Sequence, residues 1–72
     1  MTNTYLLKAR MVERGDDDCV TKLAELLDMS RTTASNKLNG KTPFNQNEIT
    51  IIANYYNLSA EDIQKIFVKD DE

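Results

Sequence analysis

Six polar side chains between Ser30 and Leu38 could form hydrogen bonds with another molecule. Ala34 and Leu38 interrupt this polar run four residues apart, which is the spacing of one helix face. A helix over 31–38 would therefore bury those two residues and present the polar side chains outward. The six are Arg31, Thr32, Thr33, Ser35, Asn36 and Lys37. Their guanidinium, hydroxyl, amide and ammonium groups suit recognition by hydrogen bonding.

The preceding residues contain the apolar pattern of a second helix. Positions at the i, i+3, i+4 and i+7 spacing are occupied by Val20, Leu23, Ala24 and Leu27. The pattern stops at Asp28 and resumes at Ala34, with Ser30 as a good N-cap between them. Two short helices, 19–28 and 31–38, are thus predicted to meet at a tight corner. A helix-turn-helix of this kind can place its second helix in the major groove of DNA.

Start and stop signals predict three further helices. One spans about 4–14, with Asn3 or Thr4 as its cap. Another opens at the capping-box pair Asn45 and Glu48, and the last opens in the same way at Ser59. We therefore expect an all-α fold of five short helices in one domain over 1–72, with frayed ends at 1–3 and 69–72.

The composition argues against several classes of protein. There is no histidine and only one cysteine, so neither an internal disulfide nor a Cys/His metal site can form. The chain has only two glycines, so a glycine-rich phosphate-binding loop is not expected. It has no nucleophilic side chain paired with a general base, so catalysis is not expected either. We expect no enzyme activity, no metal or other cofactor and no small-molecule ligand. No apolar run is long enough for a membrane span and no signal peptide is evident, so a cytoplasmic protein is expected.

The charge is unusual for a nucleic-acid-binding protein. The net charge is −3 and the pI is about 4.8, whereas phosphate contacts usually require a basic surface. However, the acid clusters at 16–30 and at 59–72, while residues 1–15 and 31–58 each carry a small positive surplus. The proposed reading helix therefore lies outside the acidic segments.

Several other features have two interpretations. The run 16–18 of three aspartates suits a helix cap better than a metal site. Cys19 follows those aspartates, which makes an inert small residue more plausible than a redox sensor. Tyr56 is expected to pack in the core and Tyr55 to be exposed or at an interface, in preference to a stacking platform for single strands. An apolar set near the end could form a dimer interface or dock on its own core; it comprises Ile63, Ile66, Phe67 and Val68.

Two segments carry a resemblance to a known family. LAELLDMSRTTASNKLNGKTPF and the following EITIIANYYNLSAEDI resemble the phage repressor and Cro-type (XRE-like) helix-turn-helix family, in particular short Gram-positive prophage regulators. The resemblance spans residues 5–68. It implies a lambda-repressor-like fold and a homodimer that binds double-stranded operator DNA in a bacterial host cell.

The resemblance also assigns roles to residues. The base-contacting set that it implies is Arg31, Thr32, Thr33 and Asn36, and these side chains suit guanine, thymine and adenine edges. The phosphate-contacting set is Ser30, Ser35, Lys37, Asn39 and Lys41. The family commonly has glutamine where this chain has Val20 and glycine where it has Asp28, so weak binding by a monomer is expected.

Two hypotheses follow about function. The first is a sequence-specific transcriptional regulator, a Cro-like repressor that binds a pseudo-palindromic operator as a dimer. The second is a protein-interaction module of the same fold, an antirepressor-like protein whose acidic surface binds another regulator. Retention on a DNA or heparin resin at low salt distinguishes them.

Overall fold

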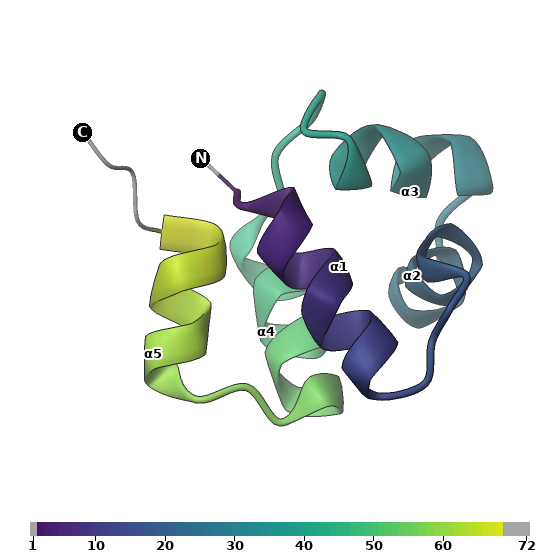
Figure 1. Ribbon diagram of the computed structural model, residues 1–72. Helices are drawn as coiled ribbons and strands as arrows, with labels where there is room; N and C mark the ends of the chain where they lie inside the picture. The colour runs from purple at the N-terminus through teal and green to yellow at the C-terminus, as the bar shows by residue number, and fades with distance from the viewer. Residues whose placement is uncertain (1, 69–72) are drawn as a thin grey trace.

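The computed structural model describes residues 2–68, and every regular secondary-structure element in that range is a helix (Figure 1). The helices are α1 (Thr4–Glu13), α2 (Cys19–Leu27), α3 (Arg31–Leu38), α4 (Gln46–Tyr56) and α5 (Ala60–Ile63). α5 continues directly into a π-helical turn, η1 (Gln64–Val68). The expected five-helix all-α architecture is confirmed, and only the π-helical turn was not predicted from the sequence.

Each helix begins at a polar N-cap. Asn3 caps α1, and the expected capping boxes are present at Asn45 with Glu48 and at Ser59 with Asp62. These side chains accept hydrogen bonds from backbone N–H groups that have no partner within the helix. The backbone N–H of Asn3 also donates to Ile66 O, at 2.6 Å, so this residue of the expected frayed start is held on η1. Met1 and 69–72 lie outside the described residues.

The core is formed by apolar residues from every helical segment except α5, together with Phe44 from the loop before α4. Residues with at most 1% of their surface exposed are Leu7, Met11, Leu23, Ala34, Leu38, Ile52, Tyr56 and Ile66. Leu27 is only half-buried, although the sequence pattern placed it on the inner seam. The reason is that α2 ends at this residue, so its side chain lies at the edge of the helix pair.

The C-terminal apolar residues dock on the domain itself. Ile66 and Phe67 are buried in the single chain, and the Phe67 ring meets the Phe44 ring edge to face at 5.6 Å between centroids. Only Val68 of this set is largely exposed. Of the two interpretations of this segment, the structure supports packing within the protomer. Along residues 2–68, each helix is too short or too polar to cross a membrane.

The buried Tyr56 joins α4 to the loop before α2. Its hydroxyl donates a hydrogen bond of 2.7 Å to Asp16 Oδ2, and burial together with that bond raises the pKa of Tyr56 above its usual 10.0. Tyr55 is half exposed, its ring edge to face with that of Tyr56. The expected assignment of Tyr56 to the core and of Tyr55 to the surface is confirmed.

Replacing Tyr56 with phenylalanine is therefore expected to lower the free energy of unfolding by about 1–2 kcal/mol at pH 7. Above pH 10 the wild-type protein should lose stability, because the unfolded tyrosine releases its proton while the folded one retains it. The variant should lack this part of the alkaline loss. Urea unfolding followed by circular dichroism between pH 7 and 11 measures both effects. Equal alkaline slopes for the two proteins would contradict the assignment.

Candidate nucleic-acid interface

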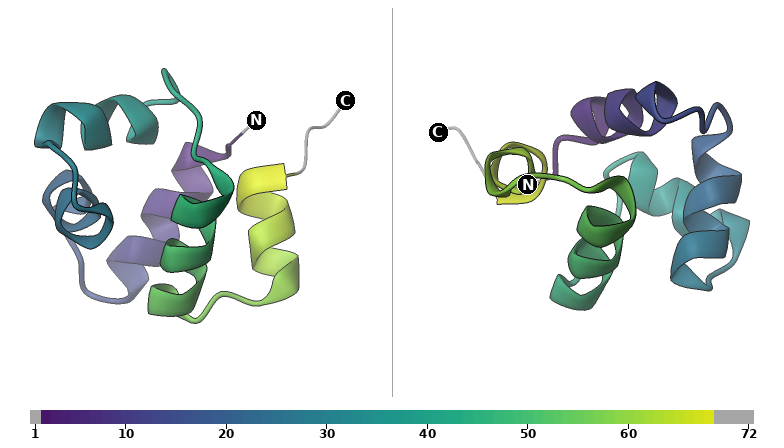
Figure 2. Two further views of the ribbon diagram at one scale, coloured as in Figure 1. Left: turned by 180° about the vertical axis from the view of Figure 1, so that it is seen from behind. Right: turned by 90° about the horizontal axis from the view of Figure 1, so that it is seen from below.

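α2 and α3 meet at a corner of three residues. Asp28, the C-cap that follows α2, has the left-handed conformation (φ 57°, ψ 54°), and Met29 N donates to Ala24 O at 3.0 Å. Aspartate is among the few residues that tolerate this conformation, so it replaces the glycine usual in related turns. Ala24 and Ala34 are small and buried, which lets the two helices approach closely. Figure 2 shows α3 lying across α2 at the edge of the molecule.

The outer side of α3 carries the predicted base-contacting residues. Arg31, Thr32 and Thr33 are exposed, and Asn36 is partly exposed. Ala34 and Leu38 hold the opposite side in the core. At 100° per residue, Asn36 and Thr32 project away from that buried pair. The structure therefore exposes all four residues at least in part, although Arg31, three residues before Ala34, lies in the first turn toward the buried side; their contacts with bases remain a prediction.

Ser30 begins α3 as a neutral cap. Its Oγ accepts from Thr33 N at 3.1 Å and donates to Thr33 Oγ1 at 3.0 Å. This confirms the N-cap that the sequence predicted. The bond fixes the first turn of α3, so Ser30 and Thr33 have defined positions at the end of the helix where the dipole is positive. A phosphate contact at Ser30 stays a prediction.

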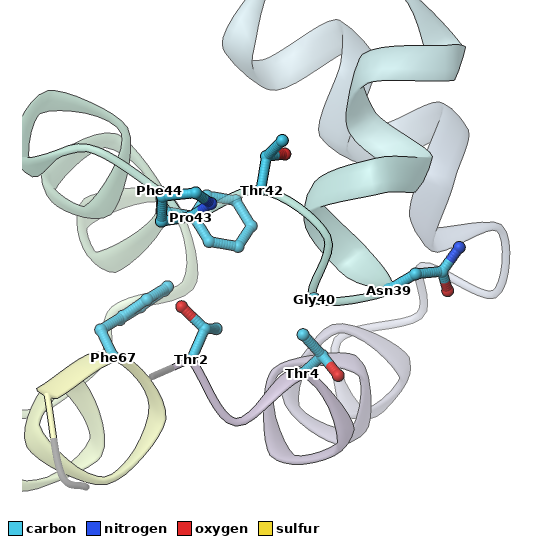
Figure 3. A pocket seen from close by; sticks show the side chains of 8 residues that line it. All are labelled: Thr2, Thr4, Asn39, Gly40, Thr42, Pro43, Phe44 and Phe67. Atoms are coloured by element: carbon cyan, nitrogen blue, oxygen red, sulfur yellow. The ribbon is translucent and has the colours of Figure 1, made fainter.

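The turn after α3 contains two more predicted phosphate contacts, Asn39 and Lys41. Both are exposed. Asn39 Nδ2 donates to Ser35 Oγ at 3.3 Å, so the Ser35 hydroxyl, a predicted phosphate contact, already accepts a hydrogen bond at the end of α3. Gly40 has φ +81°, a left-handed geometry that glycine adopts readily after a helix. A pocket beside the turn is lined by the Phe44 and Phe67 rings and by threonine side chains (Figure 3).

The comparisons with known proteins identify the family. The BetR domain profile matches residues 5–69, nearly the whole chain. The chain belongs to the BetR domain family. This is a family of small helical domains of the helix-turn-helix type, a coarser assignment than the expected phage Cro group. Neither the curated proteins nor the solved structures contain a significant match.

In this BetR domain, Lys37 is engaged within the fold. Its Nζ lies 3.1 Å from Glu48 Oε1 and donates to Pro43 O at 2.9 Å, and the lysine side chain is only 12% exposed. The ammonium also lies 5.6 Å from the centroid of the Phe44 ring. Lys37 therefore ties α3 to α4 and their connecting loop. A phosphate contact at Lys37 stays a prediction, but it would compete with these bonds, which the sequence did not indicate.

The start of α2 in the BetR domain carries its own negative group. Asp18 accepts from Thr21 N at 3.2 Å and from Thr21 Oγ1 at 2.8 Å, so the predicted cap is confirmed. These bonds, with a smaller contribution from the nearby Arg31 charge, lower the pKa of Asp18. Asp18 thus occupies the Thr21 N–H group, which could otherwise donate to a phosphate, and it offsets the charge of a predicted reading residue. The sequence signal was the aspartate run directly before α2.

Cys19 and Val20 are the first two residues of α2. Burial, offset in part by Lys8, raises the pKa of the Cys19 thiol, and the adjacent aspartates add to the rise. This favours the interpretation of Cys19 as inert, because the reactive thiolate is less populated. Val20 is apolar and cannot supply the phosphate clamp of the related family.

Proposed function

We propose that this BetR domain is a sequence-specific double-stranded DNA-binding regulator that acts in the bacterial cytoplasm as a Cro-like repressor dimer. The observation that carries the proposal is the outward polar face of α3. Ala34 and Leu38 fix the helix, while Arg31, Thr32 and Thr33 face solvent and Asn36 is partly exposed. These side chains can bond to base edges without leaving any apolar group of α3 exposed.

Two α3 helices are needed because few groups around a single α3 helix are available to bind DNA phosphates. Lys37 already pairs with Glu48, and Asp18 caps the start of α2 with a negative charge. Val20 has no polar group that could hold a phosphate. In the proposal, two protomers place α3 in successive major grooves about 34 Å apart on a pseudo-palindromic operator. The two half-sites together supply the affinity that one protomer lacks.

Selection of bound sequences from a random duplex pool tests this function. The expected result is a two-fold symmetric consensus, whose affinity exceeds that of a scrambled duplex and falls with rising salt. Equal affinity for the selected and scrambled duplexes would overturn the proposal. Failure to bind any duplex at low salt would favour the protein-interaction module, which the Asp18 cap and the acidic net charge support.

Replacing Asp18 with asparagine should strengthen DNA binding. Asparagine caps a helix as well as aspartate does, so the change removes a charge and keeps the fold. For a charge separation of about 10 Å in water at low salt, the expected gain in affinity is about fourfold for a dimer. Fluorescence anisotropy at low salt measures it.

Glu61→Gln is the matched control, since α5 lies on the far side of the molecule from α3 (Figure 1). The same gain in both variants would show that only net charge matters. No gain at Asp18 would show that this end of α2 lies away from the DNA.

A further inference from the structure

The outward side of α1 is apolar and uncovered. Two large apolar residues of α1 are exposed, Tyr5 at 84% and Val12 at 51%, and both lie on the side of α1 opposite the buried Leu7 and Met11. Together with Ala9, they follow the i, i+4, i+7 spacing of one helix face. Figure 2 shows α1 along one flank of the molecule, with no described helix beyond it. We define these three residues as the α1 face.

The α1 face forms a shallow groove, edged by Lys8 and Glu13. Ala9 lies at its middle, and a small residue there lets a second helix approach closely. Tyr5 precedes Ala9 by four residues and Val12 follows it by three, so an apolar side chain lies about one helical turn away on either side of that middle. This arrangement suits a two-fold contact, in which the same patch serves both copies.

We propose that the α1 face is where two operator-bound copies of this chain meet, with the α1 helices antiparallel. In this pairing Ala9 marks the crossing, and Tyr5 of each copy packs on Val12 of the other. Glu13 lies one residue beyond Val12 and can accept a hydrogen bond from the Tyr5 hydroxyl. This inference rests on the proposed function and names its dimer surface.

Charge favours this side of the molecule for a second copy. Residues 16–30 and 59–72 are acidic, and 31–58 include the proposed DNA-facing helix. Residues 1–15 contain one acidic residue, Glu13, so the carboxylates of two copies repel less here than across the two acidic segments. The structure has already placed Ile66 and Phe67 in the protomer's own core, which removes the other candidate surface.

The direction of pairing follows from the position of α3. The two-fold axis of an antiparallel pair runs perpendicular to α1, and Figure 1 shows α3 displaced to one side of α1 in that direction. Both α3 helices then emerge on one side of the dimer, as one duplex requires. A parallel pair would place equal positions of the two α1 helices opposite each other and would direct the α3 helices to opposite sides.

The α1 face is small for a stable interface, so the contact is expected to act on DNA rather than in free solution. Tyr5→Ala should weaken binding to the full operator by about tenfold and leave binding to a single half-site unchanged. Tyr55→Ala is the matched control, since it removes a half-exposed tyrosine from α4. Equal losses on full and half operators would overturn the proposal.

Disulfide trapping tests the orientation. In a Cys19→Ser background, a mixture of Tyr5→Cys and Val12→Cys chains should crosslink on the operator, and Tyr5→Cys alone should not. Crosslinking of Tyr5→Cys alone would show the parallel pairing, and no crosslinking of the mixture would place the interface elsewhere. If the wild-type protein binds no operator at all, the proposed function fails before this surface is tested.

Discussion

Asn36→Ala is expected to weaken operator binding by about 1–3 kcal/mol, the discrimination attributable to one base pair in each half-site. Asn36 lies opposite the buried side of α3, where an amide can both donate to and accept from adenine. Alanine favours helix more than asparagine does, so the variant should fold at least as well. The loss would therefore reflect recognition and not unfolding.

A double-mutant cycle, with one change in the protein and one in the operator, makes this test specific. The wild-type protein and the variant are each titrated with the selected operator and with an operator changed at one symmetric base pair. The variant should lose the distinction at a single position and keep it at the others. Asn47→Ala, at an exposed position near the start of α4, is the control and should leave affinity unchanged. A uniform loss over all operators would indicate that Asn36 contacts phosphate instead.

The sequence predicted the helix boundaries well because its signals are local. Caps at Ser30, Asn45 and Ser59 act within three residues, and each forms the expected bond to the backbone. The left-handed residues at Asp28 and Gly40 are also local properties, since few residue types tolerate positive φ. These features do not depend on how the helices pack.

The missed features all depend on contacts between distant segments. Lys37 meets Glu48 only because the loop through Pro43 turns back on α3, and Asp16 meets Tyr56 across forty positions of the chain. A helical wheel cannot show either pairing. The polar face of α3 could therefore be predicted from the sequence, but the lysine that is already engaged could not be recognised there.

The largest effect on folding is expected at Leu23, where α2 packs on α3. Its side chain is fully buried, so Leu23→Ala removes its contacts and leaves a cavity, at a cost of about 2–5 kcal/mol. The core of a domain of this size rarely contributes more than about 3–5 kcal/mol of stability, so much of the variant should be unfolded at 37 °C. Thermal unfolding followed by circular dichroism measures the loss.

Leu27→Ala provides the matched comparison, because the two leucines lie four residues apart on one face of α2 and the sequence pattern treats them alike. Leu27 is half-buried at the helix end, so its truncation should cost below about 2 kcal/mol. Comparable losses would mean that α2 extends further into the core than the structure shows. If Leu23→Ala acts through folding alone, a stabilising osmolyte such as TMAO should restore both helicity and operator affinity. Restored helicity without affinity would show that the α2 and α3 corner positions the reading helix as well as stabilising it.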